Sequence, residues 1–283
     1  GLEFKDKPRY ERLKGYIEPL IRQKEQEEQQ ALKAQQKAQL QQQKSSMAMS
    51  ALANNINDYL SGKVGWTNGV SFTYTEDGET KTYTPSPEER QMAVTQAVYN
   101  ATNNPNLTPE ERNKRVLKIM SCPVAEQYTK NYIAQGINAF NAITLDKNGN
   151  VVNSGRVKDF FALYTADPAE FASVMGNDLT GKIATLQVLE EGSNSMDEAL
   201  QKFATANAKF ASNPELKKAT QMQVDVALAN NQCTITTLDG KTVTIPYASS
   251  PELYNTSSNM GLYVMASEGS TNTLPNKIQE MMS

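Results

Sequence analysis

Histidine is absent from this 283-residue chain, and its absence restricts the chemistry more than any other feature of the composition. It excludes Ser-His-Asp and Cys-His nucleophilic sites and every zinc pattern that contains histidine. Two cysteines cannot supply a four-thiolate metal site. Neither of the glycine-rich patterns GxxxxGK[ST] and GxGxxG occurs, so no phosphate-binding loop is indicated. We therefore expect no catalytic residues, no cofactor site and no metal site, and we predict that the chain is not an enzyme.

Apolar runs and aromatic residues are also scarce. Apolar residues make up 39% of the chain and aromatic residues 7%, and no run of about 18 apolar residues predicts a transmembrane helix. Cys122 and Cys233 stand far apart without CxxC spacing, which favours free thiols and leaves their pairing open. The opening residues, "GLEFKDKPRYERL", include neither an initiator Met nor an apolar signal core. They indicate an excised or processed piece of a longer protein.

Helix starts are the clearest patterns that are present. "SPEERQMAV" and "TPEERNKRVLKIM" each place a Ser or Thr cap before a proline, with a Glu three residues after the cap. Such a cap oxygen accepts a backbone N–H, and the Glu reaches back to a second one. We predict caps of this type at Ser86, Thr108, Asp167, Ser195 and Ser212. The carboxylates beside these caps are better explained by helix capping than by acid–base catalysis.

Periodicity predicts helices after the caps and hairpins between them. One expected core face contains Leu216, Ala219, Met222 and Val226. Alternation around Asp77-Gly78 and around Asp239-Gly240 predicts two hairpins, and "LDKNGNVV" predicts a weaker third turn. In the Asp239 hairpin, a bulged turn that aligns Ile235 with Ile245 is favoured over a plain turn.

The stretch "QEEQQALKAQQKAQLQQQKSS" lies in a region without Gly or Pro, from Leu20 to Ser61. Its residues are good helix formers, which favours one long helix over a disordered Gln-rich tether, the alternative. Its apolar residues form too thin a row for a globular core. We therefore expect a helix of an assembly, whose interface consists of Leu32, Leu40, Met47 and Leu52.

The predicted fold class is mainly α: a long N-terminal helix, then a bundle of short capped helices with two or three small β-hairpins. The predicted segments are 1–62 (a polar Gln-rich helix, the assembly arm), 63–84 (hairpin), 85–230 (helical domain), 231–247 (hairpin) and 248–283 (C-terminal segment). Residues 1–44 carry ten basic and seven acidic residues, a net +3, which is too sparse for a nucleic-acid-binding arm. No specific nucleic-acid site is expected.

The order of these features resembles the internal virion proteins, also called ejection or inner core proteins, of short-tailed bacteriophages. The resembling part covers roughly residues 50–200 and includes "INDYLSGKVGW", "TPEERNKRVLKIM" and "KDFFALYTADPAEFASVMGNDL". Some members of this family carry a lytic transglycosylase domain, but its Glu-Ser motif is missing here, so no enzymatic activity is carried over.

The resemblance implies a structural protein that is packaged in the virion interior and moves to the host envelope on ejection. There it helps to form a conduit for DNA. Its implied partners are copies of itself and other virion proteins of the portal, core and tail, with transient contact to the host envelope. Two other classes stay open: a non-viral helical adaptor or scaffold protein, and a glycoside hydrolase that uses carboxylates alone.

Overall fold

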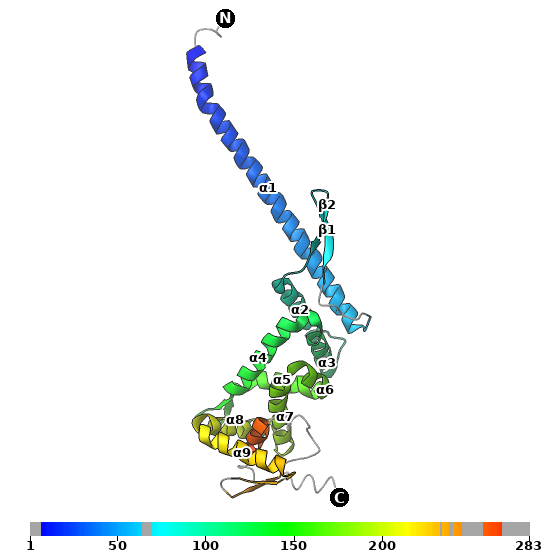
Figure 1. Ribbon diagram of the computed structural model, residues 1–283, viewed down its shortest axis with the longest axis vertical. Helices are drawn as coiled ribbons and strands as arrows, with labels where there is room; N and C mark the ends of the chain where they lie inside the picture. The colour runs from blue at the N-terminus through cyan, green and yellow to red at the C-terminus, as the bar shows by residue number, and fades with distance from the viewer. Residues whose placement is uncertain (1–6, 64–69, 233, 238–239, 245–256, 268–283) are drawn as a thin grey trace. The chain divides into compact units, whose positions relative to one another are not determined.

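The computed structural model describes residues 7–63, 70–232, 234–237, 240–244 and 257–267, and these are mainly α-helical (Figure 1). The predicted fold class is therefore confirmed. The elements in chain order are α1 (Lys7–Leu60), β1 (Phe72–Glu76), β2 (Glu79–Tyr83), α2 (Pro87–Thr102), α3 (Pro109–Met120), a 3-10 turn η1 (Pro123–Ala125), α4 (Glu126–Ala142), β3 (Thr144–Leu145), β4 (Val151–Val152), α5 (Gly155–Ala166), α6 (Pro168–Met175), α7 (Asn177–Glu191), α8 (Met196–Ser212), α9 (Pro214–Ala229), β5 (Thr234–Thr236), β6 (Thr242–Thr244) and α10 (Ser257–Ser267).

The chain divides into two compact units. The first comprises residues 1–55 and 69–90, which include most of α1, the β1–β2 hairpin and the first turn of α2. The second comprises residues 56–68 and 91–283. The predicted segments 1–62 and 63–84 thus contribute to the same unit, because the hairpin contacts α1. Most of the predicted helical segment 85–230 lies in the second unit.

Within the predicted helical segment 1–62, the helix begins well before the region without Gly or Pro, which starts at Leu20. α1 starts at Lys7 and continues through Pro19, which lies in its interior. Proline removes one helical hydrogen bond but does not always end a helix. Beyond Pro19, the good helix formers predicted from the sequence fill the helix to Leu60. The prediction that the Gln-rich stretch is part of one long helix is therefore confirmed, and the alternative of a disordered tether is wrong.

The β1–β2 hairpin has the predicted two-residue turn. Asp77 and Gly78 both have positive φ, 54° and 80°, as the tight hairpin turn requires. Phe72 lies opposite Tyr83, with their ring centroids 5.2 Å apart. On α1, Lys44 places its Nζ 4.2 Å from the centroid of the Tyr74 ring and 3.8 Å from Glu76 Oε1. These contacts hold the hairpin beside α1 (Figure 1).

Four of the five predicted caps are confirmed. The side chains of Ser86, Thr108, Asp167 and Ser195 each accept the backbone N–H three residues later. The fifth is wrong by one residue. Ser212 ends α8, and the Asn213 side chain caps α9 by accepting the Leu216 N–H. Asn is as good a cap as Ser, so the pattern permitted either residue.

In the second unit, α7 is the central element. It packs against α4, α5, α6, α8 and α10. Its buried residues come from every side of the helix; they are Leu179, Thr180, Gly181, Ile183, Ala184, Thr185, Leu186, Val188 and Leu189. A helix that is buried all round needs no polar face, and this explains its weak amphipathic pattern.

Two predictions about the second unit are wrong. The buried face of α9 consists of Thr220, Val224 and Ala227, whereas Met222 and Val226 are 60% and 59% exposed. Small and medium side chains form this face where α9 packs closely against α10. The sequence prediction weighted the larger apolar residues instead.

The second error concerns the β5–β6 register. Ile235 lies opposite Val243, while the predicted partner, Ile245, is outside the described residues. The Thr237 N–H donates to Lys241 O across the turn, and Gly240 has φ 79°. The observed register thus differs by two residues from the predicted one. Both apolar side chains thereby lie buried on one face of the hairpin.

Candidate functional site

A row of large apolar side chains lies exposed near the start of α1. We call it the N-terminal stripe, and its residues, between 48% and 74% exposed, are Tyr10, Leu13, Tyr16, Ile17, Leu20 and Ile21. At about 100° per residue they lie within about 140° of the helix circumference. Six apolar side chains on one helix face form a contiguous patch, and such a patch marks an interaction surface.

Sequence reasoning missed this stripe because Gly15 and Pro19 interrupt it. The predicted helical segment was 1–62, but the interface was sought only in the region without Gly or Pro from Leu20 onward. The signal is nevertheless present, since Tyr10, Leu13 and Ile17 are spaced by three and four residues.

The four predicted interface residues do not form one surface. Leu32 is 54% and Met47 47% exposed, and Leu40 is partly exposed. Leu52 is fully buried within the chain. It lies about 120° around the helix from Leu40, whereas Met47 lies only about 20° from it.

Leu52 is therefore not a free interface residue. Together with Ala48 and Ile56, at spacings of four, it forms a buried row in the last third of α1. Although the apolar row of the long helix is thin, this third of α1 thus buries side chains within the chain. The remaining exposed candidates for an assembly contact are Leu32, Leu40 and Met47.

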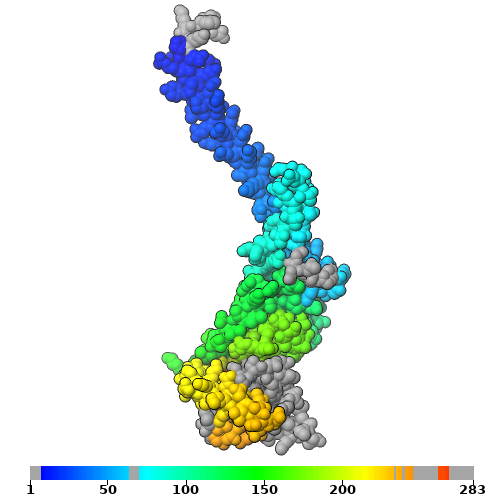
Figure 2. Space-filling view, viewed as in Figure 1, coloured from blue at the N-terminus to red at the C-terminus, as the bar shows by residue number. Residues whose placement is uncertain are grey.

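The rest of α1 is exposed on every side. Each residue from Pro8 to Gln39 is exposed, a stretch of about 48 Å at 1.5 Å per residue. Figure 2 shows the side chains of this blue part of α1 uncovered on the face in view. Side-chain contacts along this part of α1 are local, such as the Gln23–Glu27 hydrogen bond of 2.9 Å and the Lys14–Glu18 ion pair of 3.6 Å.

The most buried carboxylate among the described residues is Glu89, which is 8% exposed. Its Oε1 accepts a hydrogen bond of 2.6 Å from the Tyr83 hydroxyl and one of 3.1 Å from the Ser86 N–H. Burial by itself raises the pKa of Glu89, but the hydrogen bonds from Tyr83, Ser86 and Ser45 outweigh it, and the net pKa is lowered. Glu89 is thus held ionised, as a link between the hairpin, α2 and α1.

Other carboxylates near helix starts have similar structural roles. The pKa of Glu111 is lowered chiefly by the backbone N–H of Thr108, and that of Glu198 by the backbone N–H of Asn194. A glycosidase needs one carboxyl group whose pKa is raised, so that it can act as an acid. The carboxyl groups of six described residues have a lowered pKa instead; they are Glu76, Glu89, Glu111, Glu126, Asp146 and Glu198.

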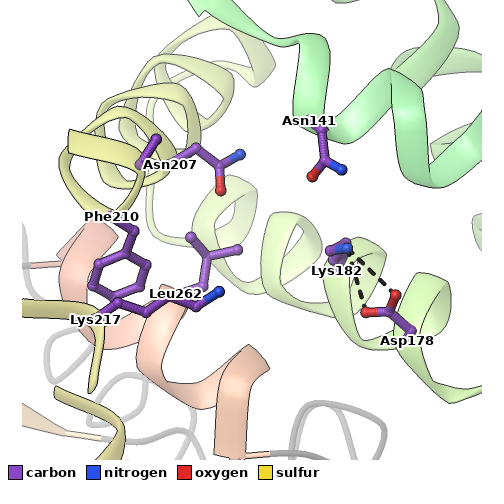
Figure 3. A pocket seen from close by; sticks show the side chains of 8 residues that line it. Asn141, Asp178, Lys182, Asn207, Phe210, Lys217 and Leu262 are labelled. Carbon is purple, nitrogen blue, oxygen red and sulfur yellow. Dashed lines mark hydrogen bonds and ion pairs between the residues drawn. The ribbon is translucent and has the colours of Figure 1, made fainter. Parts of the chain in front are cut away.

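A polar pocket of about 450 Å³ lies in the second unit (Figure 3). It is lined by Asn141, Asp178, Lys182, Asn207, Phe210, Ala211, Lys217 and Leu262. Lys182 forms an ion pair of 3.3 Å with Asp178, and the Asn207 amide donates to Phe140 O at 3.4 Å. These groups can bind a small polar solute by hydrogen bonds. Among the lining residues, no nucleophile is paired with a base.

No group of three or more potential metal-ligating side chains is found among the described residues. In the part of the chain that the structure describes, no helix is both long enough and apolar enough to cross a membrane. Cys122 is free and buried, while Cys233 lies outside the described residues.

The chain matches no protein-family model, no curated protein and no solved structure.

Proposed function

We propose that this chain is a structural protein of a larger assembly, and that α1 is the arm through which it contacts other subunits. The observation that carries this proposal is the exposure of every residue from Pro8 to Gln39. A helix with no tertiary contacts is stabilised only by intrinsic propensity and by pairs of neighbouring side chains. An exposed helix of about 48 Å therefore gains stability when it packs against a partner.

The apolar side chains that remain on the middle of the arm suit a narrow helix–helix contact. Leu40 and Met47 lie seven residues apart on nearly the same face, and Leu32 lies about 80° from Leu40. Such a seam is too narrow for a globular core but wide enough for packing between helices in an assembly. Copies of this chain are the first partner to test.

The resemblance to internal virion proteins of short-tailed bacteriophages supplies the setting of the proposal. In that setting the chain is packaged inside the capsid with the portal, core and tail proteins. It leaves with the DNA and helps to form a conduit across the host envelope. The locality of the fold supports this: hairpins joined by tight turns and helices with their own caps reform from neighbouring residues, which favours rapid refolding after passage through a channel.

The virion proposal is tested on phage particles whose genome encodes this sequence. Intact DNA-filled particles are treated with protease, the protease is inactivated, and the particle contents are analysed by peptide mass spectrometry. We expect peptides from the β1–β2 hairpin and α3 to survive in intact particles and to be lost from particles that have ejected their DNA. A chain found only in the infected cell would contradict the virion role and favour an adaptor or scaffold.

A further inference from the structure

The N-terminal stripe is flanked by charge in an ordered way. Positions around the helix axis are given as angles from Tyr10, at about 100° per residue. On this scale the stripe extends from Tyr16 at about 240°, through Tyr10 at the origin, to Ile21 at about 20°. Lys7 and Lys14 lie just beyond the Ile21 edge, within about 40°. Arg12 lies about 40° beyond the Tyr16 edge, and Arg9, at about 260°, lies about 20° inside that edge.

The acidic residues lie on the opposite side of the helix. Glu11 and Glu18 are at about 100° and 80°, well away from the middle of the stripe at about 310°. Both edges of the apolar face are therefore basic. The face turned away from it carries the two acids together with Arg22, at about 120°, and Glu18 lies 3.6 Å from Lys14 in an ion pair. The net charge of residues 7–22 is +3, from five basic and two acidic residues.

This arrangement disfavours a second copy as the occupant of the stripe. If two copies of the stripe paired as a coiled coil, Tyr10 and Ile17 would occupy one core position of the heptad. Leu13 and Leu20 would occupy the other core position. A parallel pair then places Arg9 opposite Lys14 of the other copy, at the flanking positions that select partners. An antiparallel pair that overlaps both whole stripes, centred on Gly15, places Lys14 near Lys14. Like charges meet in both cases.

The stripe is also wider than a coiled-coil seam. Six of the twelve residues from Tyr10 to Ile21 are apolar, and two of the six are tyrosines, whose rings have an apolar body and a polar tip. A basic amphipathic helix of this kind lies in the plane of a membrane surface. The long side chains at its edges can extend to lipid phosphates while their stems stay against the apolar face.

Gly15 and Pro19 are compatible with this orientation. Pro19 has no N–H, so the helix leaves the Gly15 carbonyl without its usual partner. Gly15 lies at about 140°, on the face turned away from the stripe, where water can reach its carbonyl. The proline therefore leaves no unpaired group on the apolar face.

From these observations we propose that residues 7–22 form a binding site for anionic phospholipid surfaces. The stripe enters the interface between headgroups and acyl chains, and Arg9, Arg12 and Lys14 contact lipid phosphates. This inference does not depend on the assembly contact of Leu32 and Leu40, which lies further along α1.

The test is flotation of the full chain with vesicles of phosphatidylcholine, alone or mixed with phosphatidylglycerol. We expect binding to the mixed vesicles only, with an affinity that falls as salt is added. Arg12→Gln with Lys14→Gln should weaken binding by roughly 25-fold, or about fivefold for each charge. Leu13→Ser with Leu20→Ser should weaken it on the order of a hundredfold, since two apolar side chains no longer enter the interface.

Matched control variants lie on α9. Lys217 and Lys218 are exposed lysines, and Met222 and Val226 are exposed apolar residues. Lys217→Gln with Lys218→Gln, and Met222→Ser with Val226→Ser, should leave vesicle binding unchanged. All the substituted side chains are exposed or lie at the surface of a helix, and circular dichroism checks that each variant keeps its helices.

Three results would overturn the proposal. The first is equal binding to neutral and mixed vesicles, and the second is an equal loss of binding in the α9 controls. The third is the absence of vesicle binding together with self-association of the chain that is lost in Leu13→Ser with Leu20→Ser. That last result would assign the stripe to a second copy. Failure of the assembly proposal would leave the vesicle result unaffected, because the two experiments change different residues.

Discussion

Replacing Glu89 by Gln removes the charge of the buried carboxylate that accepts hydrogen bonds from Tyr83 and Ser86 in the first unit. Gln has nearly the same shape and keeps one oxygen at the position of Oε1. The variant therefore tests whether an ionised carboxylate holds the hairpin and the start of α2 together. The two hydrogen bonds at stake are the 2.6 Å bond from the Tyr83 hydroxyl and the 3.1 Å bond from the Ser86 N–H.

The expected loss follows from the difference between charged and neutral acceptors. A hydrogen bond to a charged group contributes about 1.5–3 kcal/mol, and one between neutral groups about 0.5–1.5 kcal/mol. Two such bonds lose about 2 kcal/mol in total. The lost interaction of the carboxylate with the N-terminus of α2 adds about 0.5 kcal/mol. We therefore expect the free energy of opening the hairpin to fall by about 2.5 kcal/mol.

Native-state hydrogen exchange measures this local opening directly. Amides of residues 72–83 should exchange roughly 60-fold faster in Glu89→Gln than in the wild-type chain, since about 1.4 kcal/mol is a factor of ten. Glu111→Gln is the matched control, because Glu111 holds the same position in the capping box of α3. It should leave the hairpin amides unchanged. Equal hairpin exchange in Glu89→Gln and the wild type would refute the role of the carboxylate.

The same carboxylate predicts a pH dependence. The pKa of Glu89 in the folded chain is lowered below its ordinary value of 4.5, although burial alone raises it. A lowered pKa means that this stabilisation is fully present above pH 4.5 and is lost as the pH falls through the folded value. Hairpin exchange in the wild type, corrected for intrinsic rates, should therefore accelerate on acidification below pH 4.5. Glu89→Gln should lack this component.

Three further changes test other parts of the fold. Thr108→Ala removes the hydroxyl that accepts the Glu111 N–H at 3.2 Å, and it should lower the free energy of unfolding by about 1 kcal/mol; an unchanged melting temperature would contradict the cap. Gly136→Ala places a methyl group 2.8 Å from side-chain atoms of Leu179 and Phe160. Overpacking should lower the free energy of unfolding by about 1–3 kcal/mol, and the better helix propensity of Ala should offset this by about 1 kcal/mol. A variant more stable than the wild type would contradict the close packing of α4. Cys122 is 2% exposed, and burial raises the pKa of its thiol, so alkylation followed by peptide mapping should find it unreactive until the chain unfolds; native reaction as fast as in the denatured chain would contradict its burial.

Local chemistry made much of the fold predictable from the sequence. Caps such as Thr108 and the turn at Asp77-Gly78 are each encoded within a few residues, and the structure confirms both. Features that depend on distant packing were not predictable in this way. The buried face of α9 follows from its contact with α10, and the burial of Leu52 follows from its packing within the fold rather than from helix periodicity.

The surface of α1 was predictable only in part. Good helix formers between Leu20 and Ser61 indicated the helix. Because Pro19 disfavours a helix, the apolar residues that precede it were not recognised as one face of the same helix, the N-terminal stripe. A proline lowers helix propensity by about 3 kcal/mol without showing whether the neighbouring turns still form. From the sequence, Glu89 was recognised only as part of the Ser86 cap. Its hydrogen bond from the Tyr83 hydroxyl could not be predicted, because that bond depends on the hairpin folding beside the start of α2.

Sedimentation velocity of the full chain over a range of concentrations tests most directly whether α1 is an assembly arm. We expect a sedimenting mass that exceeds the mass of the monomer and rises with concentration. In the variant Leu32→Ser with Leu40→Ser, this mass should fall toward that of the monomer. Met222→Ser, which replaces a similarly exposed apolar residue on α9, should leave the mass unchanged. A wild-type chain that stays monomeric at every concentration, or an assembly that tolerates the loss of Leu32 and Leu40, would contradict the self-assembly of α1 through this face.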